Sequence, residues 1–193
     1  MRLFISIQML ISCMVYGSKK RLDIYRSMNC IALVMRAVYC LLYTDVQKSL
    51  IDTCIMYITY TSLDFLLLLL SHSKRPELLL HHAFTIFSYV HLYNTTGYND
   101  AYIAHMFLLA ELLSVFNLIL RHTILLIYWR RMVIIFIRMP IWIYMIYIHT
   151  QLDQNFTSKI LYKSAGILMP ILDIFFLIKT LSYPRIAYPM VKN

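Results

Sequence analysis

The chain has 193 residues, of which 61% are hydrophobic and 14% are charged, whereas charged residues make up about a quarter of a soluble globular domain. This balance excludes a soluble globular fold. The net charge of +9 lies in short segments between apolar runs, which indicates membrane topology and argues against nucleic-acid binding. The sequence therefore predicts an all-α, polytopic helical membrane protein, with about seven transmembrane helices in one bundle.

Apolar runs recur along the whole chain, and roughly 20 helical residues are enough to cross a hydrocarbon core. We expect spans at about residues 2–17, 28–43, 50–71, 77–93, 101–120, 132–149 and 160–182. Residues 1–17 would then form a first transmembrane helix, residues 18–182 the main transmembrane domain, and residues 183–193 a short cytoplasmic tail.

The first apolar run has an alternative interpretation as a signal peptide, because residues 15–17 resemble a cleavage site. Cleavage there would place Lys19, Lys20 and Arg21 on the translocated side, which is contrary to the positive-inside rule. The charges therefore favour a first span over a signal peptide.

A topology with a lumenal N-terminus and a cytoplasmic C-terminus accounts for the loop charges. It places eleven of the 18 Lys and Arg residues in the cytoplasm and four in the lumen, as the positive-inside rule requires. Both glycosylation acceptor patterns, at Asn94 and Asn155, fall in loops that this topology puts in the lumen.

Ionisable side chains within the apolar runs are the main functional signal, because a charge in hydrocarbon is costly and persists only with a partner or water. At about 1.5 Å of rise per residue, several of them fall at similar depths in the cytoplasmic half of the membrane. We expect a polar cavity there, lined by Asp64, His81, His82, Glu111, Asp173 and the counter-ions Arg36 and Arg138.

The predicted span 101–120 carries a polar stripe, since Glu111, Ser114, Asn117 and Arg121 recur every three to four residues and would share one helix face. These side chains would bind substrate in the cavity, or they would hold helices together by hydrogen bonds. His91 and His105 lie nearer the lumenal end of their runs, where we expect interfacial positions.

The adjacent His81 and His82 point about 100° apart on a helix, so that one can face the cavity while the other contacts a neighbouring helix. A histidine near neutrality can act as general base, acyl carrier or proton relay. Two histidines in a helix interface are the alternative. The pair lacks the spacing of membrane di-iron boxes, so we predict no metal site.

These residues resemble the TLC domain family, which includes translocating-chain-associating membrane proteins, ceramide synthases and the ceroid-lipofuscinosis protein of the endoplasmic reticulum. The resemblance covers residues 18–182 and rests on Asp64 late in an apolar helix, then His81-His82, then the segment from Glu111 to Arg121. It implies a multi-pass protein of the endoplasmic reticulum membrane that acts on lipids. The segment 111–121 contains no Asp or Lys, unlike that of ceramide synthases, and is closer to the small non-synthase TLC proteins.

Three functional hypotheses follow. The first is a TLC protein that binds, senses or handles lipids and influences membrane lipid composition. The second is an acyltransferase that uses the paired histidines, with Asp64 or Glu111 orienting the imidazole and acyl-CoA as the co-substrate. The third is a proton-coupled transporter. Membrane lipids are the expected partners, the residues indicate no cofactor of the protein's own, and the oligomeric state is not predicted.

Overall fold

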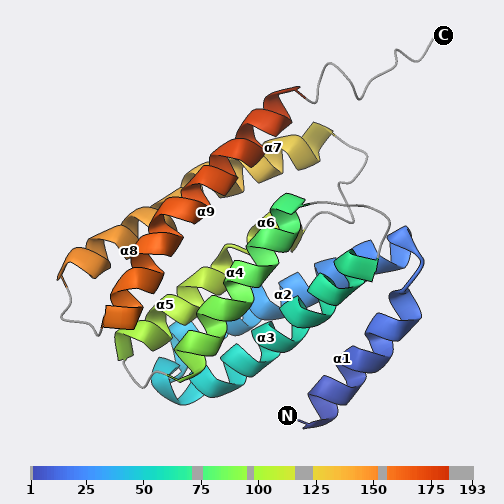
Figure 1. Cartoon of the computed structure of the whole chain (residues 1–193), viewed down its shortest axis with the longest axis horizontal. Helices are drawn as coiled ribbons and strands as arrows, with labels where there is room; N and C mark the ends of the chain where they lie inside the picture. The colour runs from blue at the N-terminus through green and yellow to red at the C-terminus, as the bar shows by residue number, and fades with distance from the viewer. Residues whose placement is uncertain (1, 71–75, 95–97, 116–123, 152–155, 183–193) are drawn as a thin grey trace. The chain divides into compact units, whose positions relative to one another are not determined.

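The computed structural model describes residues 2–70, 76–94, 98–115, 124–151 and 156–182 (Figure 1). All regular secondary structure in these ranges is helical, as the sequence predicts. The chain divides into two compact units, Met1–Leu118 and Ile119–Asn193, each with its own helix packing. Asn117, Arg121, Asn155 and the predicted tail 183–193 lie outside the described residues.

The first unit is built around α3. Its helices are α1 (Arg2–Val15), α2 (Lys19–Tyr43), α3 (Val46–Leu70), α4 (Pro76–Tyr93), α5 (Tyr98–Leu109) and α6 (Leu112–Val115). α3 packs against α1, α2, α4 and α5, and α2 also packs against α5 and α6. The N-terminal helix is therefore an integral part of this bundle.

Local sequence explains where these helices begin. Gly17 adopts a φ of 78°, which lacks a steric penalty only for glycine, and Ser18 caps α2 by accepting a hydrogen bond from the Arg21 amide. α2 consequently begins nine residues before the predicted span 28–43. Pro76 opens α4, where the missing N–H has no helical partner to lose.

The predicted span 101–120 is interrupted. α5 ends at Leu109, and the amides of Ala110 and Glu111 bond three residues back, to Phe107 and Leu108. These hydrogen bonds span three residues, as in a 3₁₀ turn, whereas those of an α-helix span four. The side chains after the turn therefore point in a different direction from those of a continuous α-helix. Ser114 lies in the short helix α6, one turn after Glu111.

The second unit contains α7 (Ile124–Val133), a π-helical turn η1 (Ile134–Arg138), α8 (Met139–Gln151) and α9 (Phe156–Ser182). α9 packs against both α7 and α8. Gly166 permits close packing, because a Cβ atom there would lie 2.6 Å from Cγ1 of Ile146 on α8. Thus α8 and α9 meet at a point where only a glycine leaves enough room.

The π-helical turn has a cause in the sequence. Pro140 carries no N–H, and in an α-helix its ring collides with the carbonyl four residues before it. The turn that precedes it is widened, so that the Met139 amide bonds to the Ile134 carbonyl. This widening lets the helix continue through Pro140 and ends at Arg138.

Two helices of the described chain are long and apolar enough to cross a membrane, Val46–Leu70 and Lys159–Ile178. α1 and α5 have 14 and 12 residues, fewer than the roughly 20 that a perpendicular span needs. The arrangement with seven spans stays a prediction.

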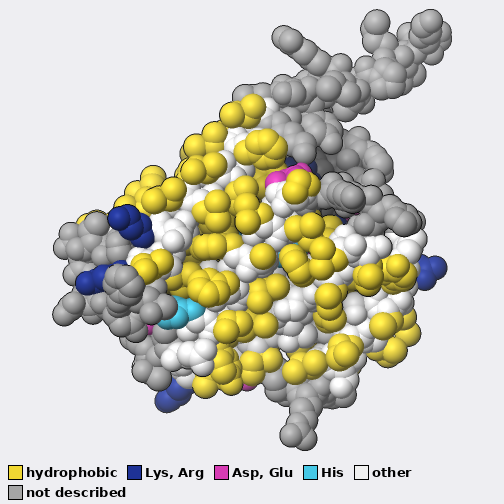
Figure 2. All heavy atoms as spheres, viewed as in Figure 1, with side chains coloured by type: hydrophobic (Ala, Val, Ile, Leu, Met, Phe, Trp, Pro, Cys, Tyr) yellow, Lys and Arg dark blue, Asp and Glu magenta, His cyan; other side chains and the backbone are white. Residues whose placement is uncertain are grey.

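Large apolar side chains cover much of the exterior of both units. Met35 and Leu42 on α2 are each 67% exposed, and Ile143 on α8 is 65% exposed. Figure 2 shows hydrophobic atoms spread over the visible face, with few charged groups among the described side chains. Many large exposed apolar side chains are typical of contact with lipid or with a partner protein.

Candidate functional site

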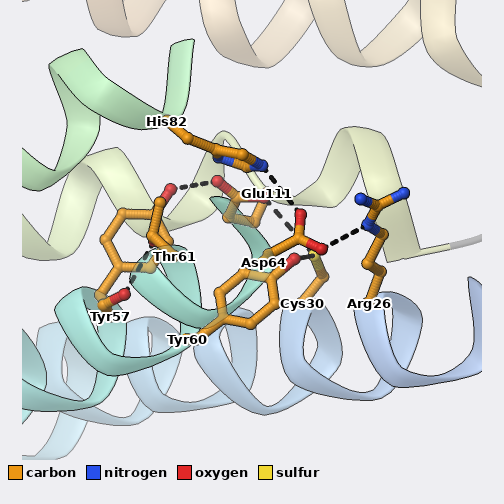
Figure 3. A network of polar contacts seen from close by, with 8 residues as sticks. All are labelled: Arg26, Cys30, Tyr57, Tyr60, Thr61, Asp64, His82 and Glu111. Carbon is orange, nitrogen blue, oxygen red and sulfur yellow. Dashed lines mark hydrogen bonds and ion pairs between the residues drawn. The ribbon is translucent and has the colours of Figure 1, made fainter. Parts of the chain in front are cut away.

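Asp64 is the centre of a polar cluster in the first unit (Figure 3). It lies on the buried face of α3 together with Tyr57, Tyr60 and Thr61, residues spaced three to four apart as one helix face requires. Its carboxylate accepts a hydrogen bond from Arg26 Nε to Oδ1 at 2.7 Å. Its second oxygen, Oδ2, lies 2.8 Å from His82 Nε2.

The three charged or titratable side chains come from three helices, α2, α3 and α4. Asp64 is 1% exposed and His82 is 7% exposed, so their contact is shielded from solvent. Arg26 supplies the positive charge that a buried carboxylate needs. The cluster therefore holds an ion pair and an imidazole together inside the bundle.

The contact with Asp64 fixes the orientation of the His82 ring. An ionised carboxylate only accepts hydrogen bonds, so Nε2 of His82 carries the proton that is donated to Asp64. The neutral ring then has its lone pair on Nδ1. Nδ1 forms no hydrogen bond with any other residue in the described ranges, and this nitrogen can accept a proton from a bound molecule.

The neighbouring His81 has a different environment. Its ring centroid lies 5.6 Å from that of His82, with the ring planes tilted by 48°, and its side chain is partly exposed. The prediction that the two histidines face different surroundings is consistent with this geometry. Of the pair, His82 is the residue that contacts Asp64.

Glu111 forms a second acidic centre in the same unit. Oε1 accepts a hydrogen bond from the Tyr57 hydroxyl, and Oε2 lies 3.5 Å from the Cys30 thiol, which donates to it. Cys30 Sγ is also 3.7 Å from the Tyr60 hydroxyl. Figure 3 shows Glu111 beside the Asp64–His82 pair, presented by the turn between α5 and α6.

Arg36 does not pair with Asp64 or Glu111 within the first unit. Its Nε donates to Thr53 Oγ1 at 3.3 Å. α2 begins at Lys19 and therefore includes Arg26, which is the arginine that contacts Asp64. Arg36 lies ten residues further along the same helix. The predicted span 28–43 begins nine residues after the start of α2, and for this reason the sequence predicted Arg36 and not Arg26 as the counter-ion.

Arg138 and Asp173 belong to the second unit and contact each other. Arg138 Nε donates to Asp173 Oδ2 at 2.8 Å, and the Trp142 indole N–H donates to the same oxygen at 2.7 Å. The guanidinium also lies 5.5 Å from the Trp142 ring, a cation–π distance. The sequence left Asp64, Glu111 and Asp173 as possible partners for Arg138. Its hydrogen bond is with Asp173.

His105 is fully buried in the first unit, and its predicted depth near the membrane interface stays a prediction. Asn94 is exposed at the end of α4, where its side chain donates to the Val90 carbonyl. Within the described ranges, no three His, Cys, Asp or Glu side chains gather in a way that would hold a metal ion.

Comparisons of the chain with protein-family models, with curated proteins and with solved structures give no match. The resemblance to the TLC family stays a prediction.

Sequence reasoning did not identify Arg26, Tyr57 or Cys30 as parts of the cluster. Arg26 was assigned to a loop, although Ser18 followed by good helix formers is a recognisable N-cap signal. Tyr57 lies seven residues before Asp64 and therefore on the same helix face. Cys30 carries no comparable signal, because only the packing of α2 against the α5–α6 region brings it to Glu111.

Proposed function

We propose that this chain is a multi-pass membrane protein of the TLC type that binds, senses or handles lipids and influences membrane lipid composition. The observation that supports this most is the buried Arg26–Asp64–His82 cluster inside a helix bundle with an apolar exterior. We further propose the endoplasmic reticulum as its location, with a lumenal N-terminus and a cytoplasmic C-terminus.

The cluster supports a functional role on energetic grounds. A buried ion pair is often no more stabilising than apolar side chains of the same volume. Ionisable groups within membrane helices accordingly mark substrate sites or proton pathways more often than they serve stability. Asp64 and His82 are also two of the residues on which the TLC resemblance rests, and their contact gives that pattern a physical basis.

A second candidate function is acyl transfer from acyl-CoA to a lipid amine or hydroxyl, and the Asp64–His82 contact favours it. In this reaction Nδ1 of His82 takes the proton of the attacking group while that group bonds to the thioester carbon. The carbon–sulfur bond then breaks, and the proton passes to the thiolate of coenzyme A. Asp64 would stabilise the imidazolium that exists between these steps.

The experiment compares the total lipid profiles of cells that express the wild type, His82→Ala or His81→Ala at matched membrane levels, with a mock control. We expect the wild type to change the profile relative to the mock. His82→Ala should abolish that change, because it removes the ring that Asp64 orients, and His81→Ala is the matched control that should retain most of it.

An unchanged profile in wild-type cells, or an equal effect of wild type and His82→Ala, would contradict the proposal. Purified protein in liposomes separates the candidates. Consumption of acyl-CoA that His82→Ala abolishes would support acyl transfer, and proton-dependent solute flux would support a transporter instead.

A further inference from the structure

A second polar cluster lies in the first unit, near the opposite end of α3 from Asp64. Its members are Arg36 on α2, Ser49 and Thr53 on α3 and His105 on α5. Thr53 precedes Asp64 by eleven residues, which is about 16 Å along a helix. The two clusters are therefore separate sites.

Hydrogen bonds fix the groups of this second cluster in a defined order. His105 Nδ1 lies 2.7 Å from the Ala101 carbonyl, which can only accept, so Nδ1 carries the proton. Nε2 of the neutral ring then accepts from the Thr53 hydroxyl at 3.1 Å. The Ser49 oxygen lies 3.2 Å from the same nitrogen, while its hydroxyl donates to the Val46 carbonyl. The Thr53 oxygen is left to accept from Arg36 Nε at 3.3 Å.

This chain of bonds holds the guanidinium of Arg36 by one edge. Thr53 and His105 are fully buried, so the support is rigid, while the Arg36 side chain is partly exposed. Its two terminal nitrogens, Nη1 and Nη2, make no hydrogen bond or ion pair with another described residue. Two adjacent N–H donors held in one plane match the two oxygens of a carboxylate or phosphate.

The charge of Arg36 distinguishes it from two other arginines on helices. Arg26 and Arg138 each contact a buried aspartate at 2.7 and 2.8 Å. Arg36 contacts only neutral groups in the described part of the chain. A guanidinium on a helix with an apolar exterior requires a counter-charge, and the described residues supply none.

The surroundings of Arg36 place it near a membrane surface if α2 spans the bilayer. It lies seven residues, or about 10 Å, before the end of α2 at Tyr43. Tyr39 and Tyr43 follow at helical spacing, are 54% and 75% exposed, and contact each other. Exposed tyrosines are typical of the membrane interface, and arginine side chains extend toward it.

We infer that Arg36 binds the oxyanion of an amphipathic lipid, a phosphate or carboxylate head group, with its acyl chain along the apolar exterior of α2. Arg36 Nη1 and Nη2 donate to the oxyanion, and Thr53 and His105 hold the guanidinium in position. This inference rests on the membrane placement in the proposed function, but it concerns a site distinct from the Asp64 cluster.

The test uses native mass spectrometry of the purified full chain in nonionic detergent, with dioleoyl phosphatidic acid, oleic acid, dioleoyl phosphatidylcholine or inorganic phosphate added. Arg36→Gln should weaken retention of an anionic lipid about tenfold or more, the scale of a charge-assisted hydrogen bond. Arg36→Lys should retain part of the lipid binding, since lysine keeps the positive charge but lacks the two adjacent N–H donors of the guanidinium.

Lys48→Gln is the matched control. It removes a positive charge near the same end of α3, at a side chain that is 87% exposed and pairs with Asp45, and it should leave lipid retention unchanged. Equal retention by wild type and Arg36→Gln would overturn the inference, as would equal losses in Arg36→Gln and Lys48→Gln. Retention of phosphatidic acid but not oleic acid assigns the site to a phosphate, and competition by inorganic phosphate at equal concentration would exclude a lipid-specific site.

Failure of the proposed function would look different. If the chain were released from membranes by alkaline carbonate, the membrane placement itself would be wrong. If the chain stays in the membrane and Arg36→Gln retains anionic lipid normally, only the Arg36 site is refuted. The His82→Ala effect on lipid profiles is measured independently of the Arg36→Gln result.

Discussion

The two units each bury an arginine–aspartate pair, and the pairs differ in what surrounds them. In both, arginine Nε donates to the aspartate at nearly the same distance, 2.7 Å for Arg26–Asp64 and 2.8 Å for Arg138–Asp173. In the second unit, the third partner is the indole of Trp142, which does not titrate. In the first unit it is the imidazole of His82, whose second ring nitrogen can form a further hydrogen bond.

A buried arginine–aspartate pair is thus common to both units, and in the first unit an imidazole joins it. Arg138, Asp173 and Trp142 are all at most 5% exposed, and together they join η1 and α8 to α9. The Asp64 cluster joins three helices, and one nitrogen of His82 makes no hydrogen bond to another described residue. We therefore propose a structural role for the pair in the second unit, and the proposed function rests on the cluster in the first.

The largest effect on stability should come from breaking the pair in the second unit. Asp173→Ala removes the carboxylate that pairs with the buried Arg138 charge, and breaking a buried pair in this way typically costs about 3–5 kcal/mol. Thermal unfolding of the purified protein in detergent measures the loss. Asp52→Ala, at an exposed carboxylate of α3, is the control and should change stability by less than about 0.5 kcal/mol.

Replacing both partners sharpens the comparison between units. Arg138→Met with Asp173→Leu should recover most of the stability that Asp173→Ala loses, because apolar pairs can substitute for buried ion pairs. It should also leave the cellular lipid profile as in wild type. Loss of the lipid effect in a stable, well-expressed double variant would contradict the structural role of this pair.

A smaller loss should follow from crowding the α8–α9 contact without touching any charge. Gly166→Ala places a Cβ atom within 2.6 Å of Ile146 Cγ1, and overpacking of this kind costs about 1–3 kcal/mol. Adding Ile146→Ala should restore part of the lost stability, as thermal unfolding would show. If Gly166→Ala alone proved neutral, close packing at this point would not contribute to the second unit.

Sequence reasoning could predict the helical class, and it selected Asp64, His82 and Glu111, which the structure brings into one region of the first unit. Their predictability has a physical reason, since an ionisable residue in an apolar run is costly wherever the helix packs. The partners of these residues were harder to predict. Arg26 depended on where α2 begins, and Cys30 and Thr53 on which helices pack together.

The interruption between α5 and α6 shows the same limit. Glu111 follows an apolar segment with no proline or glycine nearby, so the local pattern favours a continuous helix. The break at Ala110 comes with contacts of Glu111 to Tyr57 and Cys30 on two other helices. Tertiary contacts override the local helical periodicity here, and the pattern of residues along one sequence does not reveal such contacts.

The most direct test of the central claim is a double-mutant cycle between Asp64 and His82. Unfolding free energies of wild type, Asp64→Asn, His82→Gln and the double variant, measured in the same detergent, give the coupling between the two side chains. The account predicts a stabilising coupling of about 0.5–3 kcal/mol, the range for residues in direct contact. Additive effects of the two substitutions would show that Asp64 does not hold His82, and would contradict the functional site described for the first unit.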